Sequence, residues 1–219
     1  FRRVLFRSSP QLNAQRILVT LNEISFNGSV YSLSGPYVTI TDWDPPSITP
    51  VVVANADSFQ FNRSQTGFED VNLYYHIDKA QRRIQSLGFT DIQNRSIEAD
   101  PHGADGADNS FFDPGLNAIT FGEGGVDDAE DADVIWHEYG HAIQWGTVEG
   151  FGGTDNGNEE GGLGEGFGDY WAGSYSRSLD NVFSRNFVFT WDAGFTGSSG
   201  SLWSGRPLNF SGSYPNAGL

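Results

Sequence analysis

The sequence predicts an α+β fold, in which a β-rich N-terminal part precedes a long central helix and a second helix. Three observations lead to this class. Short β-rich runs separated by turn residues fill the region between Arg16 and Ala56. Apolar residues then recur at helical spacing between Phe68 and Leu87. A second helical stretch, from Asp127 to Trp145, carries two histidines four residues apart.

Composition limits the classes of protein that fit. The 219 residues are 37% hydrophobic and 14% aromatic, which suffices to bury a sizeable core in one large or two small domains. The formal net charge of -16 opposes binding to phosphate backbones and anionic lipid, so we expect no nucleic-acid partner. No run approaches the roughly 20 apolar residues of a membrane span. Because cysteine is absent, any metal must be held by His, Asp, Glu or backbone oxygen.

The sequence has features that are typical of a piece cut from a longer protein. The sequence contains no methionine and no signal peptide with an apolar core. Residues 1–15 begin with a basic stretch that matches nothing downstream, and we interpret them as a scar or tail. We divide the rest into a β-rich N-terminal region, 16–60, and a larger domain, 61–219, that is incomplete at its C-terminus.

The β-rich region contains four short runs with strand character. They are Ile17 to Leu21, Ser29 to Leu33, Tyr37 to Ile40 and Thr49 to Ala54. The turn signals Asn27-Gly28 and Ser34-Gly35-Pro36 lie between them, so we expect a small antiparallel arrangement.

The stretch from Phe68 to Leu87 is typical of an amphipathic helix, with Gly88 as its C-terminal stop. His76 within it has no metal-spaced partner, so we interpret it as a packed or partly exposed histidine and not as a ligand. Residues 96–110 are expected to form a solvated acidic loop, because their carboxylates lack the regular alternation of an EF-hand. β character resumes after this loop, and Ile119 to Phe121 is interpreted as an edge strand that can accept a peptide.

The long helix is predicted from Asp127 to Trp145, with Gly146 as its stop. Acidic residues crowd its first half, where the positive end of the helix dipole favours negative charge. A Gly-rich connection, Gly150 to Gly164, follows it. A second helix is then expected from Glu165 to Ser174.

The long helix carries the pattern His-Glu-x-x-His. His137 and His141 project from one face on successive turns, which lets both rings reach one metal ion. Glu138 lies beside this pair and can accept a proton from a metal-bound water, so it is the candidate general base. A catalytic zinc needs a third protein ligand, for which Glu165 is the candidate. Asp169, one turn later, can accept the second ring N–H of a zinc histidine.

These motifs resemble those of the gluzincin zinc metallopeptidases of the thermolysin and fungalysin type. The segment 137–141 looks like their first motif, and Gly-Glu-Gly-Phe-Gly-Asp at 164–169 looks like their second. The 23 residues from 142 to 164 are closer to the fungalysin spacing. The resemblance implies a thermolysin-like zincin domain whose C-terminal helical subdomain is cut short. It also implies that Zn²⁺ is bound by His137, His141 and Glu165.

The resemblance extends upstream to the segment that binds substrate in these families. Asn109-Ser110-Phe111-Phe112-Asp113, followed by Ile119 to Gly122, looks like the segment that ends in their substrate-binding edge strand. It implies that Asn109 and Ser110 hold the peptide backbone and that Phe112 belongs to the same subsite.

Three departures from the family pattern stand out. The families use a further histidine to stabilise the tetrahedral intermediate, yet none follows His141, and we expect it beyond Leu219. No tyrosine lies between His141 and Glu165, where thermolysin relatives have one. Asp133 matches a calcium-binding position of thermolysin, but no matching acidic partners follow Asp169, so a Ca²⁺ ion is only weakly supported.

The expected function is that of a zinc metalloendopeptidase, which hydrolyses protein or peptide substrates through a glutamate-activated water. We expect it to be part of a larger secreted protease with flanking domains. Two alternatives stay open. One is a gluzincin aminopeptidase, which would need a site for the substrate α-amine. The other is a non-catalytic secreted adhesion or glycan-binding module stabilised by a metal, suggested by the Gly, Asp and aromatic content.

Overall fold

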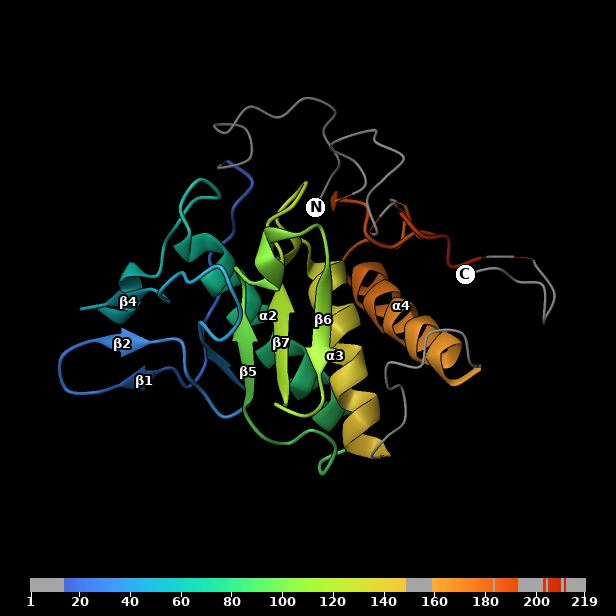
Figure 1. Cartoon of the computed structure of the whole chain (residues 1–219), viewed down its shortest axis with the longest axis horizontal. Helices are drawn as coiled ribbons and strands as arrows, with labels where there is room; N and C mark the ends of the chain where they lie inside the picture. The colour runs from blue at the N-terminus through green and yellow to red at the C-terminus, as the bar shows by residue number, and fades with distance from the viewer. Residues whose placement is uncertain are drawn as a thin grey trace.

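The structure is a computed structural model of the 219-residue chain. It describes residues 14–148, 159–182, 184–192, 203, 205–209 and 211. Within these residues, two β-sheets and three α-helices form a mixed α+β arrangement, which confirms the predicted class (Figure 1).

The larger sheet has four strands in the order β3-β5-β7-β6, with β3, β5 and β7 parallel and β6 antiparallel to β7. Its strands are β3 (Val38–Ile40), β5 (Ile97–Asp100), β6 (Ser110–Asp113) and β7 (Ala118–Phe121). All four residues of β7 are buried, and it pairs on both sides. The prediction of an edge strand at Ile119 to Phe121 is therefore wrong, and the edge on this side is β6.

Strand β5 lies inside the stretch predicted as a solvated loop. That prediction fails because Asp100 is buried yet well supplied with hydrogen-bond donors. Its Oδ2 accepts the backbone N–H groups of Trp43 and Asp44, and its Oδ1 accepts the N–H of His102. These three bonds hold the pKa of Asp100 down, but burial is the larger effect and raises it overall. Asp105, by contrast, is exposed as expected.

The smaller sheet is antiparallel, as predicted, in the order β1-β2-β4. Its strands are β1 (Ser25–Phe26), β2 (Tyr31–Ser32) and β4 (Val52–Val53). The predicted run at 17–21 forms no strand. The run at 37–40 contributes β3 to the larger sheet, so the division at residue 60 does not coincide with a boundary between sheets.

Three helices build the rest of the described fold, together with three 3-10 turns. The helices are α2 (Gly67–Ser86), α3 (Ala132–Thr147) and α4 (Glu159–Leu179). The turns are η1 (Ala56–Ser58), η2 (Ala104–Gly106) and η3 (Asp128–Glu130). Helix α2 confirms the predicted amphipathic helix. Of the two environments expected for His76, packed or partly exposed, the structure shows the packed one: the side chain is buried, and burial lowers its pKa to about 3.

Helices α3 and α4 begin at other residues than predicted. The helical conformation is interrupted at Asp131, which has an extended backbone. The side chain of Asp131 accepts the N–H of Asp133 and caps α3. The acidic residues before Asp131 are predicted to form the first half of the long helix, but they form η3 and the residues beside it. Helix α4 starts at Glu159, so the glycines 161, 162 and 164 are helical. Residues 150–158 of the predicted connection lie outside the described residues.

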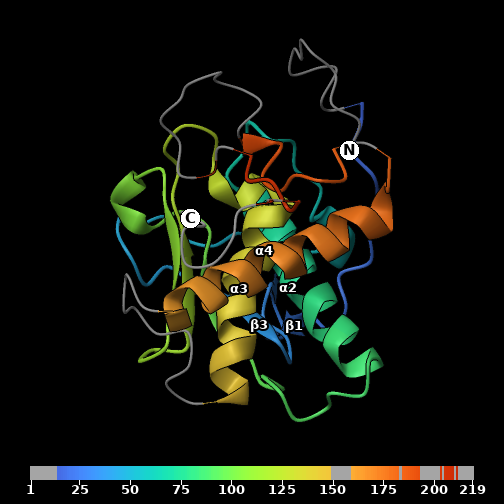
Figure 2. The same cartoon turned by 90° about the vertical axis from the view of Figure 1, so that its right-hand side faces the viewer.

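Helices α2 and α3 cover one face of the larger sheet, and α4 crosses α3 (Figure 2). The α3–α4 contact is aromatic. The Trp136 ring stacks on Tyr175 at a centroid distance of 4.1 Å and lies 4.9 Å from Trp171. Among the described residues, no helix combines the length and apolar character needed to cross a membrane.

Candidate metal centre

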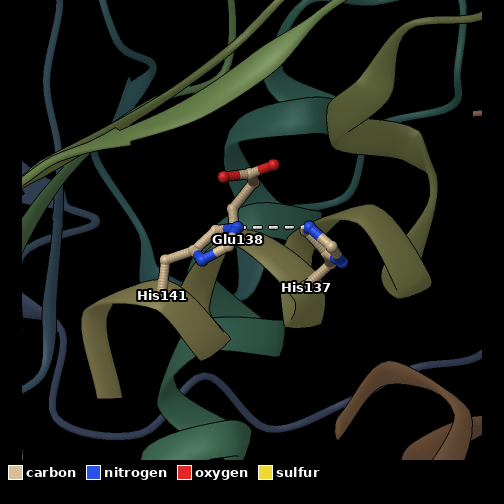
Figure 3. A group of neighbouring side chains, drawn as sticks. All are labelled: His137, Glu138 and His141. Atoms are coloured by element: carbon tan, nitrogen blue, oxygen red, sulfur yellow. Dashed lines mark hydrogen bonds between the residues drawn. The ribbon is translucent and has the colours of Figure 1, made fainter. Parts of the chain in front are cut away.

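The facing surfaces of α3 and α4 bring together three of the predicted side chains. His137 and His141 lie one turn apart on α3, and their Nε2 atoms are 3.2 Å from each other (Figure 3). Glu165, on α4, places Oε2 3.2 Å from His137 Nε2 and Oε1 3.5 Å from His141 Nε2. Two nitrogens and one carboxylate therefore converge on one point.

The spacing of these donors fits a tetrahedral ion. With metal–ligand bonds of about 2.1 Å, neighbouring ligand atoms of a tetrahedron lie about 3.4 Å apart. His137 Nδ1 is 2.9 Å from the Asp169 carboxylate, so this nitrogen carries the ring proton. The Nε2 lone pair of His137 then faces the other ligand atoms. Converging lone pairs and a carboxylate repel each other unless a cation or a proton lies between them, so the donor set fits zinc.

His137 is held firmly, whereas the other side of the centre is more open. The ring of His137 is 1% exposed and meets the rings of Phe189 and Trp203 edge to face, each at 5.5 Å. The side chain of Glu165 is 44% exposed. This asymmetry leaves the centre accessible to solvent from the Glu165 side.

Glu138 lies beside the two histidines. Its carboxylate forms a group with their ring nitrogens in which the ligand atoms are all within 4.8 Å of one another. Figure 3 shows it to one side of the line joining the two rings. Burial is the main cause that raises the pKa of Glu138 to about 8. Its position beside both rings is that of a group able to exchange a proton with a molecule bound there.

The predicted substrate residues lie at the open edge of the larger sheet. Asn109 is exposed and precedes β6, the strand that lies next to α3 (Figure 1). The Ser110 hydroxyl is buried and donates to Asp128 Oδ2 at 2.7 Å, so only the backbone of Ser110 is left for a ligand. A backbone hydrogen bond from Phe112 lowers the pKa of Glu138, which links the edge strand to the centre.

Arg206 is a member of the centre that sequence reasoning missed as a site residue. Its guanidinium is 2.9 Å from Asp169 Oδ1 and 3.3 Å from Glu165 Oε2. It also lies over the Phe189 ring, 4.6 Å from the centroid. The only signal in the sequence was a lone arginine in the aromatic, Gly-rich end of a strongly acidic chain.

Both carboxylate oxygens of Asp133, the candidate calcium ligand, accept hydrogen bonds from other parts of the protein. One of its oxygens accepts the hydroxyl of Ser176, and the other accepts the backbone N–H of Phe189 at 3.0 Å. Burial raises the pKa of Asp133 to about 8. Both oxygens thus act as hydrogen-bond anchors between α3, α4 and the segment after α4.

Two further acidic groups have ligand atoms within 4.8 Å of one another in the described residues. They are Glu69, Asp127 and Glu130, and Asp108, Asp128 and Asp192. Arg63 pairs with Glu130 at 2.6 Å in the first group. In the second, Ser110 and Trp203 donate to Asp128. Neither group contains a histidine, so the centre on α3 and α4 has the donor set best suited to zinc.

Comparisons with known proteins find little in sequence and a distant likeness in structure. No protein-family model matches the chain, and no curated protein matches it. Among solved structures, the precursor of protealysin, a metalloproteinase from Serratia proteamaculans, matches with 12% identity and a TM-score of 0.48. The match covers 78% of this chain and 51% of that chain, so the chain spans about half the length of the matched protein.

Proposed function

We propose that this chain carries the centre of a zinc-dependent metalloendopeptidase of the gluzincin type. The observation that carries the proposal is the convergence of His137 Nε2, His141 Nε2 and the Glu165 carboxylate at 3.2–3.5 Å. Asp169 behind His137 supplies the hydrogen bond that zinc histidines usually make. Three protein ligands with one open side suit a catalytic site, since a structural zinc site is closed.

In this proposal, the zinc ligands and Glu138 have different roles in peptide hydrolysis. Zinc bound at this centre would polarise the scissile carbonyl and lower the pKa of a water toward about 7. Glu138 is placed to take the proton of that water and to deliver it to the leaving nitrogen. A nearby cation stabilises the carboxylate form of Glu138 and so brings its raised pKa down toward the range of a base.

Strand β6 supports a peptide substrate in particular. Its outer edge lacks a partner strand in the described sheet, and it lies against the helix that carries Glu138. An extended peptide can add to such an edge through backbone hydrogen bonds, with Asn109, Ser110 and Phe112 as its contacts. An edge of this kind accepts chain on both sides of the scissile bond, which favours an endopeptidase. Secretion and flanking domains stay predictions from the sequence.

The test is cleavage of an internally quenched peptide with a blocked N-terminus, measured on the zinc-loaded chain. Glu138→Gln is expected to lower kcat/KM by about 10²- to 10⁴-fold, because the proton acceptor is lost. The matched control is Glu98→Gln, at an exposed carboxylate on β5, which is expected to leave the rate unchanged. Equal rates for Glu138→Gln and wild type would remove Glu138 as the base. Cleavage that requires a free N-terminus would favour the aminopeptidase instead.

A further inference from the structure

Two glycines lie where α3 and α4 cross. A Cβ atom built on Gly140 of α3 would lie 3.1 Å from the Cα of Gly168 on α4. Because neither glycine has a side chain, the backbones of α3 and α4 approach each other more closely here than larger residues would allow. The two helix backbones therefore approach each other closely beside the candidate zinc ligands.

Gly168 also faces the ring of His137 directly. A Cβ atom at this position would lie 2.6 Å from His137 Nδ1, 2.8 Å from Cε1 and 2.9 Å from Cγ. Such distances are well below van der Waals contact, so either the ring or α4 would have to move. The space that a side chain at position 168 would occupy is thus filled by the ring of His137.

The ring of His137 has little room to retreat. It is 1% exposed and lies against the rings of Phe189 and Trp203. Its Nδ1 is held by Asp169 at 2.9 Å. A larger residue at Gly168 would therefore displace α4 rather than the ring alone, because packed interiors have few voids.

The displacement of α4 would act on the third ligand. Glu165, Gly168 and Asp169 stand at positions i, i+3 and i+4, so they share one face of the helix. We propose that Gly168 is a positioning residue, whose lack of a side chain sets the distance between the Glu165 carboxylate and the two histidines for zinc binding. This inference rests on the proposed function, because it takes zinc as the ligand of the centre.

Gly166 is a matched control on the same helix. A Cβ atom there would meet nothing within 4 Å, and the position is exposed. Both Gly166→Ala and Gly168→Ala remove a glycine from the helix and raise helix propensity equally. Only Gly168→Ala places an atom against His137.

The experiment measures zinc affinity of the metal-free chain by competition with a chromophoric chelator. Gly168→Ala is expected to weaken zinc binding by about 10- to 100-fold, the effect typical of losing support around a zinc ligand. Gly166→Ala is expected to stay within about twofold of wild type. The absorption spectrum of the Co²⁺-substituted protein should change for Gly168→Ala alone, since it reports ligand geometry and not stability.

A second readout needs no metal. In the metal-free protein, the imidazole nitrogen shifts of His137 should change in Gly168→Ala, because the contact with Asp169 is disturbed. If Gly168→Ala fails to fold, Gly140→Ala, with its milder 3.1 Å contact, is expected to show a smaller loss of zinc affinity in the same direction. Wild type that binds zinc, together with unchanged affinity and Co²⁺ spectrum in these variants, would overturn this inference alone. Wild type that binds no zinc would overturn the proposed function as well.

Discussion

His102 shows how a single buried side chain can determine the response of this acidic chain to pH. It is 1% exposed, with Nε2 3.2 Å from Asp70 and Nδ1 2.8 Å from Glu123. Burial alone would lower the pKa of His102, but hydrogen bonds and charges from both carboxylates raise it to about 9. The imidazolium thus ties α2 to the segments that follow β5 and β7.

The stability that His102 contributes should disappear at alkaline pH. A histidine with a raised folded-state pKa contributes fully below its unfolded value near 6.5, and its contribution is lost as the pH rises through about 9. We expect the difference in unfolding free energy between wild type and His102→Gln to shrink by at most roughly 3 kcal/mol from pH 6 to pH 10. Urea unfolding across this range measures it, and a difference that is constant with pH would refute the assignment.

Residues of the centre could be predicted when their geometry is local. His137, Glu138 and His141 follow from helix periodicity, since a spacing of four residues fixes a shared face. Glu165 and Asp169 follow from the same periodicity on a second helix. Arg206 could not be placed in this way, because it reaches Glu165 and Asp169 from a segment 37 or more positions away. No local pattern encodes such a contact.

At the scale of elements, the α3–α4 interface determines whether the centre forms. Trp136 is 2% exposed, stacks on Tyr175 with an interplanar angle of 7° and contacts Trp171. It lies next to His137 in sequence but packs between the helices. The aromatic interface therefore holds α4 against the helix that carries both histidines.

Loss of this packing should be costly. Trp136→Ala is expected to lower the unfolding free energy by about 3–5 kcal/mol, the cost of deleting a large buried aromatic ring. Tyr170→Ala on α4 is the control, because that ring is 66% exposed and its loss should cost about 0.5 kcal/mol or less. Denaturant unfolding of the metal-free chain compares the two. Equal losses would show that the interface contributes no special stability.

The elements that sequence reasoning missed form because tertiary contacts override the local propensities of their residues. Strand β5 carries Glu98 and Asp100, which look like loop residues until three backbone donors converge on the Asp100 carboxylate. The start of α4 contains several glycines, which usually weaken a helix by about 1 kcal/mol each. Further along α4, close packing against α3 requires a small residue, as the contact between Gly140 and Gly168 shows.

At the scale of the whole molecule, the centre lies where parts remote in sequence meet. Strand β6, helices α3 and α4, and the segment around Arg206 all reach it. The α+β class could be predicted from runs and periodicity, but strand pairing could not. The parallel pairing of β3 with β5 joins residues 38–40 to 97–99, and only the folded chain reveals it.

Zinc titration of the metal-free chain tests the central proposal most directly. Isothermal calorimetry should show about one zinc ion bound per chain, because His137, His141 and Glu165 form a single set of three ligands. Glu138→Gln should retain this stoichiometry, and His141→Gln should lose most of the affinity. A folded chain that binds no zinc, or that binds it equally well after His141→Gln, would contradict the proposed centre.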